Sequence, residues 1–88
     1  MPKVVITHEV ADIDRWLAGK AERAEAITRV GSNVTDHVAL DGSKRVAITA
    51  DVHDLAALQA MLTSPPPDVA AKMAEHGVVP PVVAYVQK

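Results

Sequence analysis

The feature of this chain that most restricts its fold is a β-branched strand that leads directly into a capped helix. Residues 3–10 are rich in valine, isoleucine and threonine and predict a buried strand. Asp12 follows as a natural N-cap, and the only tryptophan, Trp16, lies shortly after it in the predicted helix. The junction therefore brings a titratable ring, His8, near a large aromatic side chain, and this combination suggests a small pocket.

The helix after this junction is predicted to run from Ile13 to about residue 30 and to stop near Gly31. Its apolar positions recur at helical spacing, which is typical of an amphipathic helix that packs on a sheet. The stripe consists of Ile13, Trp16, Leu17, Ala21, Ala24 and Ile27.

The remainder of the chain predicts three more strands and two more helical segments. Residues 33–40 alternate in polarity, and a turn at 41–43 joins them to a strand at 44–52 as a hairpin. Asp54 caps a helix over 55–62, Pro65–Pro67 interrupt it, and a further helix over 66–76 ends at Gly77. The last strand, 78–87, contains Pro80 and Pro81, which cannot donate ladder hydrogen bonds, so we expect it at a sheet edge.

The predicted order is β-α-β-β-α-β, an α+β ferredoxin-like fold with an antiparallel four-stranded sheet and a second helical region split by Pro65–Pro67. We expect one domain over residues 1–88, with the helices on one face of the sheet. We also expect the first and third strands to be parallel neighbours. That pairing would bring all four histidines, and the N-termini of the first two helices, to one rim of the sheet.

Composition narrows the class of protein. Nine basic and eleven acidic residues give a net charge of −2, and no basic stripe with interleaved aromatics is present, so we expect no nucleic-acid partner. No apolar run is long enough to span a bilayer or to resemble a signal peptide, so we expect no membrane association. Cysteine is absent, as is common for proteins of the reducing cytoplasm, where we expect this chain to act.

Small size and strands that are apolar on both sides indicate self-association. A domain of 88 residues buries only about 60 to 65% of its unfolded surface, and helices on one face leave the other face of the sheet uncovered. A second copy of the chain is the simplest cover, so we expect a homodimer.

The histidines are the main candidates for chemistry. His8 shares the inward face with apolar residues and is either an acid or base in a pocket, with general base as the role in the enzyme hypothesis, or a hydrogen-bonded core histidine. His37 and His53 are candidate acid or oxyanion partners, or solvated residues at strand ends. Asp51 and His53 share one face, but without further ligand spacing they do not predict a metal site. We expect no metal and, without a flavin or nicotinamide motif, no cofactor.

Several other residues are candidates for the pocket wall. His76 next to Gly77 either favours a helix C-terminus or lines the cleft, and Trp16 is either plain core or a pocket wall. Tyr85 either donates to a substrate carbonyl or lies at a dimer seam. The remaining candidates are Asp51, Met61 and Met73.

Three stretches together resemble small members of the dimeric α/β-barrel superfamily: residues 8–16, residues 51–62, and Ser64-Pro65 leading to residues 76–81. That superfamily includes antibiotic-biosynthesis monooxygenases, muconolactone isomerases and polyketide cyclases. The resemblance spans nearly the whole chain. It implies a homodimer whose two sheets pack face to face, with a cleft between sheet and helices in each subunit. Haem-degrading relatives use an Asn-Trp-His set, from which this chain departs, since it has His8 on the first strand and its tryptophan on the first helix.

Two functional hypotheses follow. The first is a cofactor-independent enzyme that uses histidine acid/base chemistry on a small aromatic, polyketide-like or lactone substrate. Isomerisation or cyclisation requires only proton transfer, whereas oxygenation requires a substrate able to react with O₂ itself. The second hypothesis is a non-catalytic dimer that binds a small apolar or aromatic molecule or serves as a structural module. An enclosed cavity containing His8 would favour the enzyme.

Overall fold

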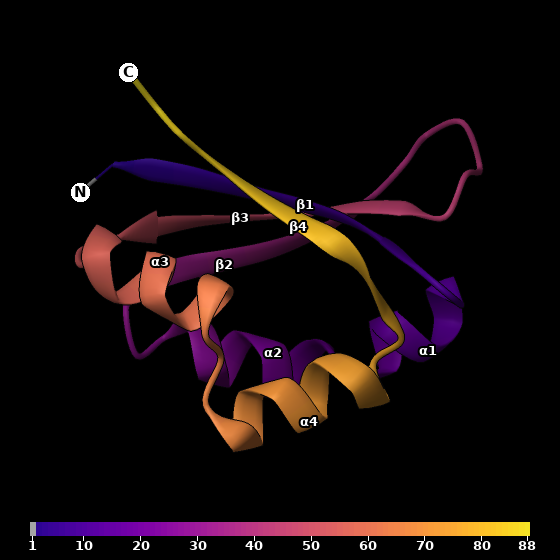
Figure 1. Ribbon diagram of the computed structural model, residues 1–88. Helices are drawn as coiled ribbons and strands as arrows, with labels where there is room; N and C mark the ends of the chain where they lie inside the picture. The colour runs from indigo at the N-terminus through magenta and orange to yellow at the C-terminus, as the bar shows by residue number, and fades with distance from the viewer. Residues whose placement is uncertain (1) are drawn as a thin grey trace.

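The computed structural model describes residues 2–88, which form a four-stranded antiparallel sheet with the helices on one side (Figure 1). The strand order is β2-β3-β1-β4. The strands are β1 (Lys3–Val10), β2 (Gly31–Val38), β3 (Arg45–Val52) and β4 (Val78–Val86), and the helices are α1 (Ile13–Ala18), α2 (Lys20–Ile27), α3 (Leu55–Thr63) and α4 (Pro67–Glu75). With α1 and α2 as the first helical segment and α3 and α4 as the second, both on the same side of the sheet, this is the ferredoxin-like arrangement that the sequence predicts.

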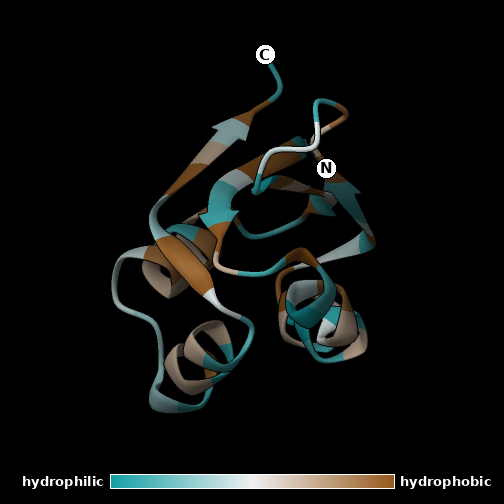
Figure 2. Ribbon diagram, turned by 90° about the vertical axis from the view of Figure 1, so that its right-hand side faces the viewer, coloured by the Kyte–Doolittle hydropathy of each residue, from teal (hydrophilic) through white to brown (hydrophobic). Residues whose placement is uncertain are grey.

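The sheet has one face buried under the helices and one face left open. Along β1 and β3 the side chains alternate between buried and more exposed positions, as the pleat of a strand requires. Figure 2, turned by 90°, shows the two layers, with the sheet above the helices. The buried strand positions that form the core are Val4, Ile6, Val10, Val46, Ile48, Ala50 and Val52.

The pairing of β1 with β3 corrects the expected topology, because the two strands are antiparallel rather than parallel. Lys3 pairs with Asp51, and His8 pairs with Val46. The crossover through α1 and α2 returns β2 in the direction of β1, and the hairpin then reverses β3. His53, just beyond the end of β3, therefore lies roughly 20 Å along the strand from the level of His8. The prediction that all four histidines share one rim is wrong, and the N-termini of α1 and α3 lie at opposite ends of the sheet.

The long first helix of the prediction is also corrected, since it is interrupted at Gly19 and ends at Ile27. Glycine is a weak helix former, and here it is required for space: a Cβ at Gly19 would overlap the imidazole ring of His76. Gly31 does not follow a helix end but begins β2, where a Cβ would overlap the backbone carbonyl of Asp51.

The buried stripe of this helical region differs from the expected apolar one. Leu17 and Ala21 are exposed, and Arg23 is buried in their place. The buried positions recur every three to four residues and are Trp16, Gly19, Arg23, Ile27 and Val30. A charged residue thus occupies the centre of the face that packs on the sheet.

Caps and edges agree with the sequence. Asp12 accepts a hydrogen bond from the Arg15 backbone N–H, and Asp54 accepts one from Ala57. β4 is an edge strand, and its pairing with β1 shifts register where Pro80 and Pro81 lie. No helix within residues 2–88 is long and apolar enough to cross a membrane.

Substituting Gly19 tests the contact with His76. Gly19→Ala should lower the free energy of unfolding by about 1–3 kcal/mol, because the new methyl group overlaps the imidazole. Urea unfolding monitored by circular dichroism measures this change. In a His76→Ala background the same substitution should be neutral or stabilising, since alanine favours a helix more than glycine does. Equal effects in both backgrounds would contradict the proposed overlap.

Candidate functional site

A cavity of about 140 Å³ lies between the sheet and helices α2, α3 and α4. It is comparable in size to an engineered cavity of ~150 Å³ that admits benzene. Most of its wall is apolar, and the buried polar residues in it are His8, Arg23 and His76. The principal apolar residues of the wall are Ile6, Ile27, Ile48, Leu58, Met61, Met73, Val78 and Val82.

His8 is part of the wall of this cavity. Its Nδ1 lies 2.8 Å from the backbone carbonyl oxygen of Glu9, and because a carbonyl only accepts, Nδ1 carries the proton. The other nitrogen, Nε2, has no hydrogen-bond partner among residues 2–88 and is not one of the enclosed polar atoms. Burial lowers the pKa of His8, against the backbone hydrogen bond to Glu9, and the positive charge of Arg23 lowers it further. At neutral pH the ring is therefore neutral, with Nε2 as a free acceptor.

Arg23 is the centre of a buried polar cluster next to the cavity. Its Nη2 and Nε lie 3.0 and 3.4 Å from the two carboxylate oxygens of Asp36, and both side chains are more than nine-tenths buried. Its Nη1 donates to the backbone carbonyl of Trp16 at 2.9 Å and lies 3.3 Å from Nδ1 of His76. One guanidinium thus connects α2 with α1, with β2 and with the end of α4.

Trp16 packs between Arg23 and His8. The guanidinium carbon of Arg23 lies 3.9 Å from the centre of the indole, within the range of a cation–π interaction. The rings of Trp16 and His8 meet edge to face, with centroids 6.0 Å apart. Trp16 is fully buried and does not itself line the cavity, so its contact with the His8 ring is a packing contact outside the cavity wall.

His76 closes one end of the cavity. Because arginine can only donate, Nδ1 of His76 accepts from Arg23, and the proton of the neutral ring is on Nε2. That nitrogen is enclosed and has no partner within the described part of the chain. Burial and the neighbouring Arg23 lower the pKa of His76, against the opposing influence of Glu22 and Glu75. The ring is thus a packed, neutral acceptor for Arg23.

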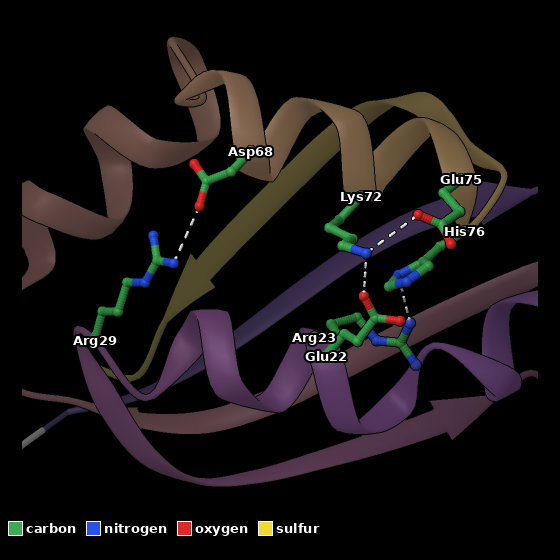
Figure 3. Close-up of polar contacts among 7 residues, drawn as sticks. All are labelled: Glu22, Arg23, Arg29, Asp68, Lys72, Glu75 and His76. Carbon is green, nitrogen blue, oxygen red and sulfur yellow. Dashed lines mark hydrogen bonds and ion pairs between the residues drawn. The ribbon is translucent and has the colours of Figure 1, made fainter.

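The mouth of the cavity lies between α2 and α4, because the exposed residues of its wall are on these two helices or, for Arg29, in the turn that follows α2. Two ion pairs cross it: Arg29 lies 3.1 Å from Asp68, and Lys72 contacts Glu22 (Figure 3). Lys72 also lies 3.3 Å from Glu75 of its own helix. These hydrogen bonds lower the pKa of Asp68 and Glu22 and raise that of Lys72.

The other candidate residues lie outside the cavity. His37 projects from the open face of the sheet, where its Nε2 is 3.0 Å from the hydroxyl of Thr49. His53 is exposed beyond the far end of β3. Asp51 accepts a hydrogen bond from Asn33 at 2.7 Å, which lowers its pKa, and Tyr85 is 58% exposed on the edge strand. Of the residues expected at the site, the cavity brings together His8, Met61, Met73 and His76.

The sequence-based analysis missed Arg23 and Asp36 as partners. Arg23 lies seven residues after Trp16 and four before Ile27, which places it on the buried face of the helix. Asp36 lies on the same face of its strand as Val34 and Val38, because these residues are two positions apart. Opposite charges at core positions of two consecutive elements are a signal for a buried ion pair. Within residues 2–88 no group of three or more histidine or acidic side chains could hold a metal ion.

Comparisons with known proteins identify the fold. No model of a known sequence family matches the chain, and neither does any curated protein sequence. The structure is similar to that of an antibiotic biosynthesis monooxygenase, with a TM-score of 0.66 and 18% identity over 100% of this chain and 97% of the other.

Two further structures are described as proposed antibiotic biosynthesis monooxygenases. The one from Bordetella bronchiseptica gives a TM-score of 0.69 at 11% identity over 99% of this chain and 94% of the other. The one from Deinococcus radiodurans gives 0.61 at 14% identity over 100% and 91%. The chain thus has the ferredoxin-like fold of the antibiotic biosynthesis monooxygenase-like proteins, and at these identities the similarity concerns the fold.

The buried ion pair can be tested by removing one partner or both. Arg23→Met should lower the free energy of unfolding by about 3–5 kcal/mol, because it leaves the Asp36 carboxylate buried and unpaired. The double variant Arg23→Met/Asp36→Leu should be more stable than Arg23→Met alone. Chemical unfolding monitored by circular dichroism measures both changes. Arg29→Met is the matched control, since Arg29 and Asp68 are more than half exposed, and it should have little effect.

Proposed function

We propose that this chain is a cofactor-independent enzyme in which His8 takes a proton from a small ring-containing substrate held in the cavity. The observation that carries the proposal is the state of His8: buried in the wall of an apolar cavity, neutral, bonded to the backbone through Nδ1–H, and without a partner for Nε2 among residues 2–88. A neutral imidazole in a fixed tautomer is the form that acts as a general base.

The chemistry best matched to this site is isomerisation of an unsaturated lactone or a similar carbonyl compound. His8 Nε2 takes the proton from the carbon next to the carbonyl, the electron pair of that C–H bond moves into the ring as a dienolate, and the protonated His8 returns the proton to a distal carbon. The step begins and ends with neutral species, and electrons and protons balance without an oxidant or a cofactor. Isomerisation is thus a simpler assignment than oxygenation.

The enzyme is further proposed to act as a homodimer through the open face of the sheet. Val79, Val83 and Tyr85 of β4 are 37%, 39% and 58% exposed, and their pairing partners on β1 place them on the face opposite the helices. Together with Val5 and Ala47 they form an apolar surface that a second copy of the chain would cover. The sheet of the second copy would also cover the face of β1 opposite His8 and so stabilise this strand.

The role of His8 can be measured with α-angelica lactone, whose isomerisation to the conjugated lactone is followed by absorbance. His8→Gln should lower the catalysed rate by roughly 100- to 10,000-fold, because the general base is lost. Since burial lowers the pKa of His8, the wild-type rate should be constant above about pH 6.5 and fall only at lower pH, as the ring becomes protonated. His53→Gln is the control, because His53 lies outside the cavity. An unchanged rate in His8→Gln would disprove the assignment.

The proposed dimer can be measured by size-exclusion chromatography with light scattering. Val83→Lys should produce a monomer, because it buries a charge at the centre of the proposed interface. Leu40→Lys is the matched control: Leu40 is fully exposed in the loop between β2 and β3, outside the strands that form the open face, so this variant should remain dimeric. A monomeric wild-type protein at micromolar concentration would contradict the proposal.

One observation favours the alternative of a non-catalytic binding protein. The donors of Arg23 are directed at Asp36, Trp16 and His76, and Nε2–H of His76 is enclosed, so the buried donors of the wall provide no acid partner for His8. If the lactone binds in the cavity and is not turned over, this alternative is preferred.

A further inference from the structure

We propose that the cavity is selective for uncharged, single-ring molecules that carry one hydrogen-bond donor, phenol being the simplest. This inference rests on the assignment of His8 Nε2 as the acceptor in the proposed function. It goes further, because charge, size and hydrogen-bonding capacity of the ligand are each restricted by a different part of the wall.

Charge is restricted because the buried ionic groups of the wall are already compensated. The guanidinium of Arg23 makes two contacts with the Asp36 carboxylate and one with the Trp16 carbonyl. His76 is neutral and uses Nδ1 to accept from Arg23. The other charged residues of the wall, Glu22, Glu25, Arg29, Asp68 and Lys72, are exposed at the mouth. An anionic or cationic ligand in the buried part of the cavity would therefore lose its hydration without gaining a counter-charge, and this cost is large in an apolar environment.

Size is restricted by the volume of about 140 Å³ and by the framework around it. Ile6 and Ile48 belong to the central strands of the sheet, and α2 covers the cavity from the other side. A molecule with one six-membered ring fills such a space. A fused two-ring system would have to displace α4, none of whose residues between Pro67 and Glu75 is buried.

Hydrogen bonding is restricted by the tautomer of His8. Because Nδ1–H is bonded to the Glu9 carbonyl, the only function that His8 offers the cavity is the lone pair of Nε2. A ligand that brings an O–H satisfies this acceptor, whereas a hydrocarbon of the same size leaves it unpaired. A hydrogen bond of this kind contributes about 0.5–1.5 kcal/mol, or roughly 2- to 13-fold in affinity.

The experiment is a titration of the ¹⁵N-labelled full chain with four probes: phenol, toluene, benzoate and 2-naphthol, followed by two-dimensional NMR. Phenol, which is uncharged at neutral pH, should bind roughly 2- to 13-fold more tightly than toluene. Benzoate and 2-naphthol should bind at least 10-fold more weakly than phenol. The shifted resonances should belong to β1, α2 and α4.

Variants locate the effect in the cavity. His8→Phe keeps a ring next to Trp16 and should reduce phenol binding to the level of toluene. Ala26→Leu should weaken every probe, because Ala26 lines the cavity, whereas Ala21→Leu on the exposed side of the same helix should not.

The possible outcomes separate this inference from the proposed function. Equal binding of phenol and toluene by the wild-type chain, tighter binding of benzoate, or shifts confined to the open sheet face would overturn the inference, and these readings need no variant. Selective phenol binding without turnover of the lactone would uphold it and refute the catalytic proposal. Lactone turnover by a chain that binds phenol and toluene equally would support the catalytic proposal and overturn the inference about ligand selectivity.

Discussion

The buried contact between Arg23 and Asp36 is the interaction on which the rest of the structure depends. An ion pair inside a core is costly unless geometry and further hydrogen bonds compensate the lost hydration, and here Trp16 and His76 supply those further contacts. Through these contacts, the side chain of Arg23 joins α2 to β2, to α1 and to the end of α4. The cavity lies in the space that this cluster leaves beneath α2, and the cluster forms its polar end.

The same cluster explains how the ring of His8, the proposed base, is oriented and kept neutral. Trp16, held in place by the guanidinium, supports the imidazole edge to face, and the charge of Arg23 adds to the desolvation that keeps the ring neutral. The backbone carbonyl of Glu9 then selects the tautomer. The orientation of the His8 ring, its protonation state and its tautomer thus have three separate physical causes.

Much of the architecture could be predicted from local patterns, and the failures have identifiable reasons. The Asp12 and Asp54 caps, the edge position of Pro80 and Pro81, and every strand could be recognised, because these features depend on neighbours in sequence. The relative direction of β1 and β3 could not be read from any local signal. A parallel pairing would place His53 beside His8, whereas the antiparallel pairing puts the two residues at opposite ends of the sheet.

The sequence by itself determined the order of elements, the helix caps, the alternating faces of the strands and the inward position of His8, since these follow from residue spacing and backbone chemistry. Only the tertiary structure decided that Gly19 must be a glycine, that Arg23 belongs to the core and that His76 faces the cavity. Each of these depends on a contact between segments far apart in the chain: His76 reaches Gly19 across 57 residues, and Arg23 meets Asp36 across the turn into β2. The spacing of Arg23 and Asp36 places each of them on a buried face, but only the folded chain shows which distant group compensates each side chain.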